Sequence, residues 1–144
     1  MPSFAHRVTA RFGDCDPVGI LYYPRFFDWF HRAMEAWYGH LGLPYQHLLQ
    51  ERLVGFPSVH AEADYRTPVR FGDTVEVRLT VLEFGRSTIA LGFEVWGDGE
   101  ARARATGRVV TVVMCLDPTS ERHMRAIACP DDVRARIERF VEGS

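Results

Sequence analysis

The stretch Pro24–His40, PRFFDWFHRAMEAWYGH, decides the architecture of this chain of 144 residues. Its large apolar residues recur at helical spacing, and polar residues fill the remaining face. Proline suits a first helical position, and Gly39 and Gly42 suit the end of a helix. A helix with so much apolar surface must be covered, and a sheet is the most economical cover. The residues that recur at this spacing are Phe26, Phe27, Phe30, Met34, Trp37, Tyr38 and, just after the stretch, Leu41.

Alternating segments on both sides of this helix predict the strands of that sheet. Turn sequences such as Gly97-Asp98-Gly99 separate the later strands, which are expected to form an antiparallel meander. A short helix over 45–51 and a terminal helix from Pro130 complete the expectation. This order indicates an α+β fold rather than a doubly wound α/β fold. The expected strands cover residues 4–12, 57–65, 74–83, 87–96 and 101–116.

Length and composition indicate one globular domain over residues 1–144. Hydrophobic residues make up 47% and charged residues 25%, which excludes extensive disorder. The formal net charge of -2 gives no basic field for nucleic acid or a membrane surface. No apolar run approaches the ~20 residues of a membrane-spanning helix. Three scattered cysteines favour a reduced, cytoplasmic setting over disulfides or structural zinc.

Residues 13–24, GDCDPVGILYYP, hold the densest set of chemical groups. Two carboxylates and a glycine precede a helix start, where backbone N–H groups are unpaired and carry partial positive charge. No Ser, Thr, Asp or Asn stands next to Pro24 to cap these groups, so they are available to a ligand oxygen. Because proline lacks an N–H, Tyr23 is the expected donor. The pattern suits acyl transfer, but it is also typical of a loop whose Asp side chains bind backbone amides.

The segment resembles the signature of the hotdog-fold acyl-CoA thioesterases, in the branch of the 4-hydroxybenzoyl-CoA thioesterases. The resemblance covers nearly the whole chain and includes residues 65–73, YRTPVRFGD, and 125–127, RAI. It implies a long helix wrapped by a curved antiparallel sheet. It also implies homodimers and usually homotetramers, with active sites at the dimer interface. Coenzyme A is then part of the substrate, and neither a cofactor nor a metal is expected.

By this resemblance, Asp16 is the catalytic carboxylate of an acyl-CoA thioesterase, acting as nucleophile or as general base for water. The backbone N–H of Tyr23 would polarise the thioester carbonyl. Gly19 would let the loop backbone approach the substrate, and Asp14 would be structural. Both mechanisms remain open at this point.

The residues around Tyr23 bear on the acyl group. Tyr22 and Pro24 are also assigned to substrate binding, and the aromatic-Tyr-Pro variant resembles the enzymes of aromatic, benzoyl-type acyl-CoA more than those of short chains. Arg25 stands where the family usually has Asn or His. This departure leaves the contacts at the helix start open.

Three arginines follow or flank turns late in the chain: Arg86, Arg122 and Arg125. Coenzyme A carries a pyrophosphate and a 3′-phosphate, and arginines near a pocket mouth would hold them. We therefore assign these three to substrate binding, with surface solubility as the alternative role of each.

Other residues allow competing interpretations. His60, Glu62 and Asp64 share one face of a strand, and a solvated or interface-facing side is favoured over a metal or acid–base set. We expect Cys15 to be a packing residue. A non-catalytic acyl-CoA-binding module is an alternative to the thioesterase. A hotdog hydratase or dehydratase is less favoured, because no histidine stands between Arg7 and Phe30 to serve it.

Overall fold

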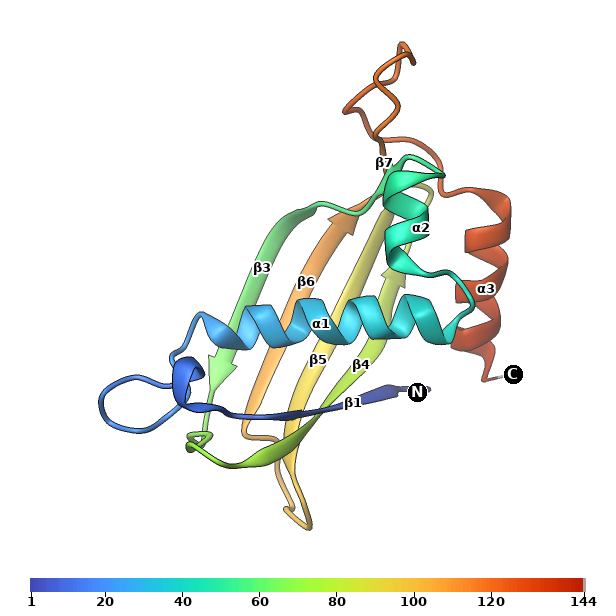
Figure 1. Ribbon diagram of the computed structural model, residues 1–144. Coiled ribbons are helices and arrows are strands. Elements are labelled where there is room, and N and C mark those ends of the chain that lie inside the picture. Colours follow the sequence, from blue (N-terminus) through green and yellow to red (C-terminus); the bar gives the residue numbers. More distant parts are fainter. Residues whose placement is uncertain (144) are drawn as a thin grey trace.

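A five-stranded antiparallel sheet curves around one long helix in the computed structural model, which describes residues 1–143 (Figure 1). The helix, α1, spans Arg25–His40, so the prediction from its apolar spacing is confirmed. The strand order is β1-β4-β5-β6-β3. The strands are β1 (Phe4–Thr9), β3 (Ser58–Tyr65), β4 (Thr74–Phe84), β5 (Thr88–Gly97) and β6 (Ala105–Val112).

The apolar face of α1 packs directly on the sheet. Phe30 stacks on Phe93 of β5, with ring centroids 4.7 Å apart. A Cβ atom at Gly107 of β6 would overlap the Phe30 ring, so glycine there permits the close approach of helix and sheet. The helix residues buried in this layer are Phe26, Trp29, Phe30, Ala33, Met34, Trp37 and Tyr38.

Two strand predictions extend too far. β1 ends at Thr9, because the 3-10 turn η1 (Phe12–Asp14) follows it. The expected strand 101–116 starts only at Ala105 and breaks after Val112. A separate strand β7 (Met114–Cys115) then pairs with β2 (Val54–Gly55), which the sequence analysis missed. Both of these strands have two residues, too few to show an alternating pattern.

The meander prediction holds only for β4, β5 and β6. β3 does not lie beside β4, its successor in the chain, but beyond β6 at one edge of the sheet. β1 forms the opposite edge. β3 therefore pairs with one strand only, and its outer backbone edge has no partner among residues 1–143.

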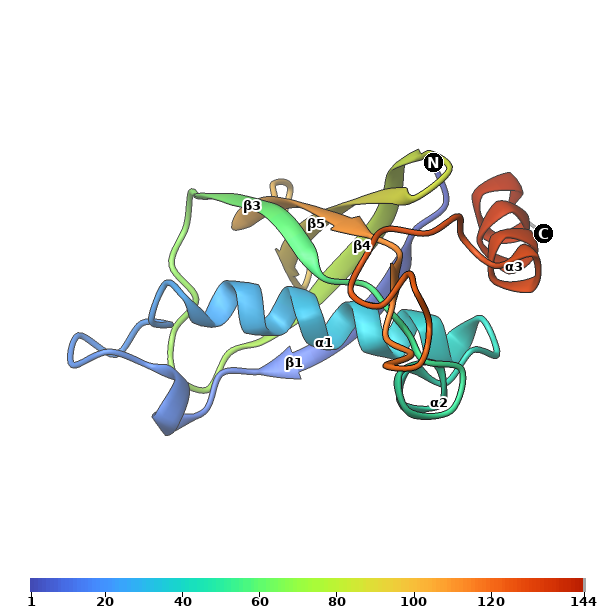
Figure 2. The same cartoon turned by 90° about the horizontal axis from the view of Figure 1, so that it is seen from above.

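Two further helices lie near the C-terminal end of α1 (Figure 2). They are α2 (Tyr45–Gln50) and α3 (Asp131–Glu142), and both were predicted. A two-pronged ion pair between Arg52 and Asp132, at 2.7 and 2.8 Å, connects the segment after α2 to α3. No helix within residues 1–143 has both the length and the apolar character needed to cross a membrane.

Candidate active site

The loop before α1 is held in place by a second loop from a distant part of the chain. The Leu21 amide donates to the Val69 carbonyl at 2.7 Å, and the Phe71 amide donates to the Gly19 carbonyl at 3.0 Å. An isolated bridge pairs Ile20 with Arg70 between these two bonds. Two of the segments that carry the family resemblance, 13–24 and 65–73, are thus joined backbone to backbone.

Asp16 has one anchored carboxylate oxygen and one open one. Its Oδ1 accepts the amides of Val18 at 2.9 Å and Ile20 at 3.4 Å. Its Oδ2 accepts no hydrogen bond from residues 1–143. Gly19 has φ +87°, which lets the loop turn back so that these amides face the carboxylate. A hollow of about 410 Å³ is lined here by Phe12, Cys15, Asp16, Pro17, Gly19 and Phe71.

Asp14 is bound within the loop. Its Oδ2 accepts the Arg11 amide at 3.0 Å, and its backbone carbonyl accepts the Tyr22 amide at 2.9 Å. Arg25, at the first turn of α1, brings its Nε within 3.9 Å of Asp14 Oδ1. The Asp14 side chain therefore spans the turn η1 and the helix start, as a structural residue would.

The helix start has fewer open donors than the sequence analysis expected. The amides of Arg25, Phe26 and Phe27 bond to the carbonyls three residues before them, at 2.9, 3.2 and 3.1 Å. No side chain caps the helix, as expected. Within the described residues, the Tyr23 amide has no acceptor, and Pro24 has no N–H. The Tyr23 N–H is therefore the donor that this turn leaves available to a ligand.

Tyr65, at the end of β3, touches the helix start and was not singled out from the sequence. Its hydroxyl donates to the Tyr23 carbonyl at 3.4 Å, and its ring lies 4.9 Å from that of Phe26. Burial, and then the neighbouring Tyr23, raise the pKa of Tyr65. The available signal was its place as the first residue of the segment 65–73.

An apolar groove runs along α1 between the helix and the inner face of the sheet, with a volume of about 250 Å³. It begins at Phe27, one helical turn after Tyr23, so its near end lies about 6 Å along the helix axis from the Tyr23 amide. Its lining is formed by Phe27, Phe30, His31, Met34, Ser58, Ala61, Phe93 and Val109.

The polar residues of β3 face away from that groove. Ala61 lines the groove, so strand alternation places His60 and Glu62 on the opposite face, together with Asp64. His60 Nε2 lies 3.5 Å from Glu62 Oε2. No three His, Cys, Asp or Glu side chains within residues 1–143 are grouped as metal ligands. These residues are not brought together with Asp16 inside one chain.

Cys15 lies beside Asp16 in the same hollow. Burial, and then the carboxylates of Asp14 and Asp16, raise the pKa of its thiol. Because only the thiolate is a strong nucleophile, this environment disfavours Cys15 as an attacking group.

The three late arginines lie at the other end of the sheet. Arg86 follows the end of β4, whereas the Asp16 loop is bonded next to its start. β4 has 11 residues, which corresponds to about 35 Å of extended strand. Arg122 and Arg125 belong to the loop after β7, which projects from that same far end (Figure 1). One chain therefore does not bring these arginines to Asp16.

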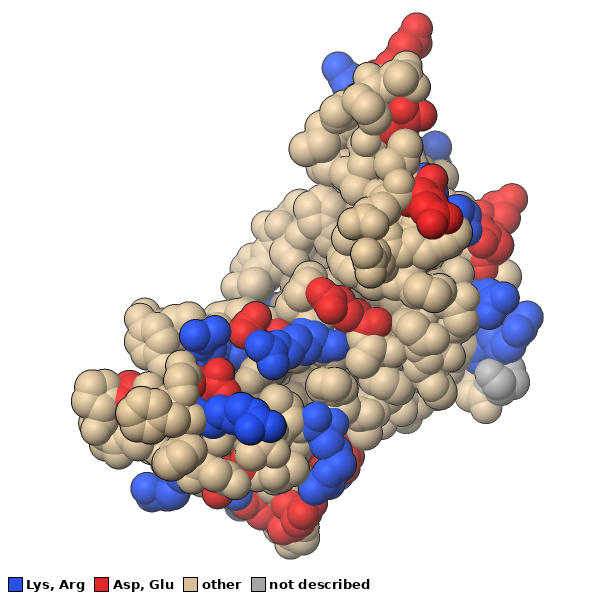
Figure 3. All heavy atoms as spheres, in the orientation of Figure 1, with Lys and Arg blue, Asp and Glu red and all other residues tan. Residues whose placement is uncertain are grey.

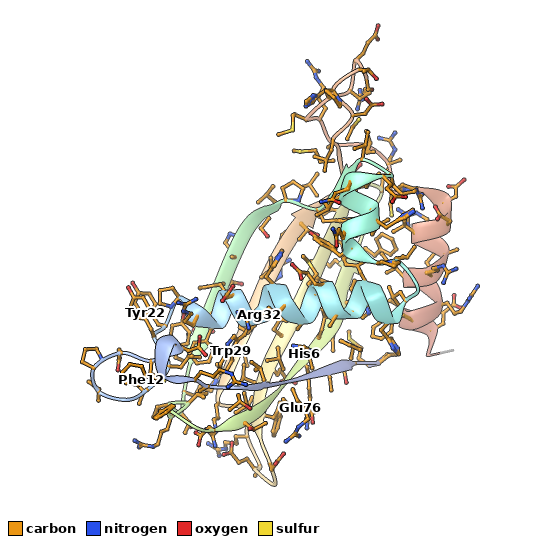
Figure 4. The ribbon with its side chains drawn as sticks, viewed as in Figure 1. His6, Phe12, Tyr22, Trp29, Arg32 and Glu76 are labelled. Atoms are coloured by element: carbon orange, nitrogen blue, oxygen red, sulfur yellow. The ribbon has the colours of Figure 1, made fainter. Side chains whose placement is uncertain are left out.

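A different set of arginines lies beside Asp14, two residues before Asp16 in the loop, and was missed by the sequence analysis. A groove of about 650 Å³ between β1 and α1 is lined by Arg7, Arg11, Arg25 and Arg32, with Asp14 as its one carboxylate. In Figure 3, arginine side chains gather over the N-terminal half of α1, and Figure 4 labels Arg32 in this part of the helix. Local spacing relates Arg7 to Arg11 and Arg25 to Arg32, but not one pair to the other, because the fold brings β1 and α1 together.

Known proteins match this chain in both sequence and fold. Residues 10–137 match the thioesterase-like superfamily. A 1,4-dihydroxy-2-naphthoyl-CoA hydrolase from Synechococcus elongatus is 30% identical over 118 residues, which cover 81% of this chain and 84% of the relative. The solved structure of 4-hydroxybenzoyl-CoA thioesterase from Pseudomonas sp. strain CBS-3 superimposes with a TM-score of 0.81 at 26% identity, covering 94% of this chain and 99% of the other.

A gentisyl-coenzyme A thioesterase of known structure is similar to the same degree. It superimposes with a TM-score of 0.80 at 26% identity, covering 94% of this chain and 99% of the other. The predicted hotdog fold and the predicted class, a thioester hydrolase, are thereby confirmed, and this chain belongs to the thioesterase-like superfamily.

Proposed function

We propose that this protein hydrolyses an aromatic acyl-CoA to the free acid and coenzyme A, with Asp16 as its catalytic carboxylate. The observation that carries the proposal is the state of Asp16, whose Oδ1 is fixed by two amides while its Oδ2 stays open beside a hollow. The loop's hydrogen bonds orient such a carboxylate through one oxygen and leave the other oxygen free to react.

The chemistry needs two groups, and the loop supplies both. Asp16 either attacks the carbonyl carbon, forming an anhydride that water then cleaves, or removes a proton from an attacking water molecule. In both routes the C–S bond breaks and the sulfur leaves as a thiolate that takes a proton. The Tyr23 N–H donates to the carbonyl oxygen as negative charge develops on it.

The aromatic character of the acyl group is supported by the groove along α1. Its walls include Phe27, Phe30 and Phe93, and ring faces and edges pack well against an aromatic acyl group. Three relatives named above act, by their names, on 1,4-dihydroxy-2-naphthoyl-CoA, 4-hydroxybenzoyl-CoA and gentisyl-CoA, each of which has an aromatic acyl group.

A second copy is proposed as the binding partner, joined through the open edge of β3. An unpaired strand edge favours pairing with another strand. Val59 on this strand is 64% exposed, and Tyr65 is exposed as well. Strands that pair around a two-fold axis run antiparallel, so the Tyr65 end of one copy would meet the Ser58 end of the other.

That pairing would also bring the late arginines toward Asp16. The Tyr65 end of β3 touches Tyr23, and the segment before Ser58 pairs with β7, next to the loop that holds Arg122 and Arg125. In an antiparallel pair, this loop of one copy points toward the helix start of the other. The arginines would then hold the phosphates of coenzyme A across the interface.

The test combines a substrate panel with isotope labelling. Benzoyl, hydroxybenzoyl, hydroxynaphthoyl and straight-chain acyl-CoA are compared by detection of the released thiol, and the aromatic substrates should show the larger kcat/KM. A single turnover in ¹⁸O water, together with acid quench to trap an acyl-enzyme, then separates the two routes. Label in Asp16 with unlabelled product indicates nucleophilic attack by Asp16, with water opening the anhydride at the Asp16 carbon. Label in the product with none in Asp16 supports the general base only when no acyl-enzyme is trapped, because an anhydride opened at the acyl carbon gives the same label. A protein that cleaves none of the panel would contradict the proposal.

A further inference from the structure

Arg104, at the end of the turn between β5 and β6, has a side chain that is only 17% exposed. Its Nη1 donates to Asp73 Oδ2 at 2.7 Å, and its Nη2 donates to Glu100 Oε1 at 2.6 Å. Its backbone carbonyl accepts the amides of Arg66 at 2.8 Å and Thr67 at 3.0 Å. Arg104 thus forms hydrogen bonds with both ends of the connection 66–73 between β3 and β4.

Asp73 connects Arg104 to the turn 69–73, which supports the Asp16 loop. The same Oδ2 that binds Arg104 also accepts the Arg70 amide at 2.9 Å, and the Asp73 amide donates to the Arg70 carbonyl at 3.0 Å. These bonds, first the one from the Arg70 amide and then the one from Arg104, lower the pKa of Asp73. The carboxylate therefore stays an acceptor for both donors at neutral pH.

The turn closed by Asp73 is the only part of the described chain, outside the loop itself and η1, that hydrogen-bonds the backbone of residues 16–21. Its Val69 carbonyl and Phe71 amide hold Leu21 and Gly19. Gly19 and Leu21 in turn flank Ile20, whose amide binds Asp16 Oδ1. A continuous series of contacts therefore leads from Arg104, through Asp73 and the turn, to the Asp16 carboxylate.

We infer that Arg104 is a positioning residue, which fixes the orientation of the Asp16 carboxylate by clamping the turn 69–73. Its kinetic consequence rests on the proposed function, whereas its effect on the loop does not. A displacement of about 1 Å at a reacting group can lower the rate by as much as ~100-fold. Partial loosening of this loop should therefore lower kcat by about tenfold and change KM little.

The chain offers a matched control far from Asp16. Arg52 binds Asp132 at 2.7 and 2.8 Å, so this pair is as short as the one between Arg104 and Asp73. It joins α3 to the segment after α2 and touches neither the turn 69–73 nor the Asp16 loop. Loss of the Arg52 pair should therefore cost stability without moving the carboxylate.

The test compares Arg104→Gln, Arg104→Lys and Arg52→Gln by kinetics, melting temperature and hydrogen exchange. We expect Arg104→Gln to lower kcat about tenfold and to speed exchange of the Leu21 and Phe71 amides. Arg104→Lys keeps the charge but not the guanidinium that donates to two carboxylates at once, so its kcat and exchange rates should fall between those of Arg104→Gln and the wild type. Arg52→Gln should leave kcat within about twofold and leave these amides unchanged.

Two results would overturn the inference. One is normal exchange at Leu21 and Phe71 in folded Arg104→Gln, which shows that the turn does not depend on Arg104. The other is an equal loss of kcat in Arg52→Gln, which shows a general effect of lost stability. If the wild type cleaves no acyl-CoA, the proposed function fails, and the exchange experiment alone still decides whether Arg104 holds the loop.

Discussion

The two ends of the curved sheet differ in the kind of chemistry that they carry. At the start of β4 lie the Asp16 carboxylate and the open Tyr23 amide, and the apolar groove along α1 lies over the middle of the sheet. At the end of β4 lie Arg86 and the projecting loop with Arg122 and Arg125. One end holds the carboxylate and the amide of the proposed site, and the other holds exposed arginines with the exposed carboxylate of Glu121 among them.

This separation bears on how a complete site can form. About 35 Å of strand lies between the two ends, and none of the contacts within residues 1–143 joins them. In the proposed function an acyl-CoA contacts both kinds of group, unless the arginine groove between β1 and α1 binds the phosphates instead. The difference between the two ends therefore raises the question of whether one chain or two chains form a complete site.

The largest effect is expected at the Asp16 end. Asp16→Asn keeps the shape and the bonds that Oδ1 accepts, but removes the negative charge that attacks or takes a proton. Turnover should fall by about 100-fold or more, while the melting temperature changes little. Thiol release from acyl-CoA gives the rate, and circular dichroism checks the fold. A folded variant with near-normal turnover would remove Asp16 from the mechanism.

A second large effect should follow from separating the copies. Val59→Lys combined with Glu62→Lys adds three positive charges to each open edge of β3, so that two such edges repel each other. We expect monomers by light scattering and a fall in kcat/KM of about tenfold or more, because the proposed dimer brings the arginines of one copy to the Asp16 loop of the other.

The matched control places the same charges elsewhere. Val141→Lys with Glu142→Lys adds three positive charges on α3, away from the β3 edge. This variant should stay associated and active. If the β3 variant is a monomer and remains fully active, one chain suffices, and the arginine groove beside Asp16 becomes the better candidate for the phosphates.

A smaller effect is expected from the arginines of the far end. Arg122→Ala or Arg125→Ala should raise the KM for acyl-CoA roughly fivefold each and leave kcat nearly unchanged, since the phosphates do not react. A pantetheine thioester lacks these phosphates and should not respond. Arg32→Ala, in the groove near Asp16, provides the comparison, and a larger rise in KM there would reassign the phosphates to that groove.

Mixed oligomers test directly whether Asp16 and the arginines of one site come from one chain or from two. Asp16→Asn copies carry intact arginines, and Arg122→Ala/Arg125→Ala copies carry an intact Asp16. If the ends meet across two chains, mixing the two variants should produce sites with a normal KM. If both ends serve the same chain, the mixture should show only the raised KM of the arginine variant.

Much of the fold was predictable because its signals are local. Helical spacing from Phe26 to Tyr38 located α1, and alternation located β4 and β5 almost to the residue. The position of β3 beyond β6 was not predictable, because it depends on a long connection rather than on a turn. Strand length was overestimated where the chain leaves the sheet, at η1 and before Ala105.

In the candidate site, too, local signals predicted some features and not others. The loop with Asp16 and Tyr23 was found because its residues are contiguous and resemble a family signature. The support from Val69 and Phe71 could not be seen, because hydrogen bonds between distant backbones leave no mark in local spacing. Arg104 lies 31 positions from Asp73 and follows no motif, so only the folded chain reveals their contact.

The smallest expected effect compares two carboxylates that stabilise the two ends. The pKa of Asp73 is lowered mainly by the Arg70 amide and then by Arg104, and the pKa of Asp132 is lowered mainly by Arg52. A lowered pKa in the folded state means that the stabilisation is present above the unfolded pKa of about 3.9 and is lost as the pH falls through the folded value.

Asp73 should contribute more to that acid-dependent loss than Asp132. Its side chain is 33% exposed against 55% for Asp132, so solvent and salt screen it less. Between pH 6 and pH 3, Asp73→Asn should therefore flatten the fall in melting temperature by about 2 °C more than Asp132→Asn does. Melting curves at low salt and at 0.5 M salt measure this difference, and salt should weaken the Asp132 contribution first. Equal slopes for the two variants would mean that the Asp16 end is no more firmly held than the far end.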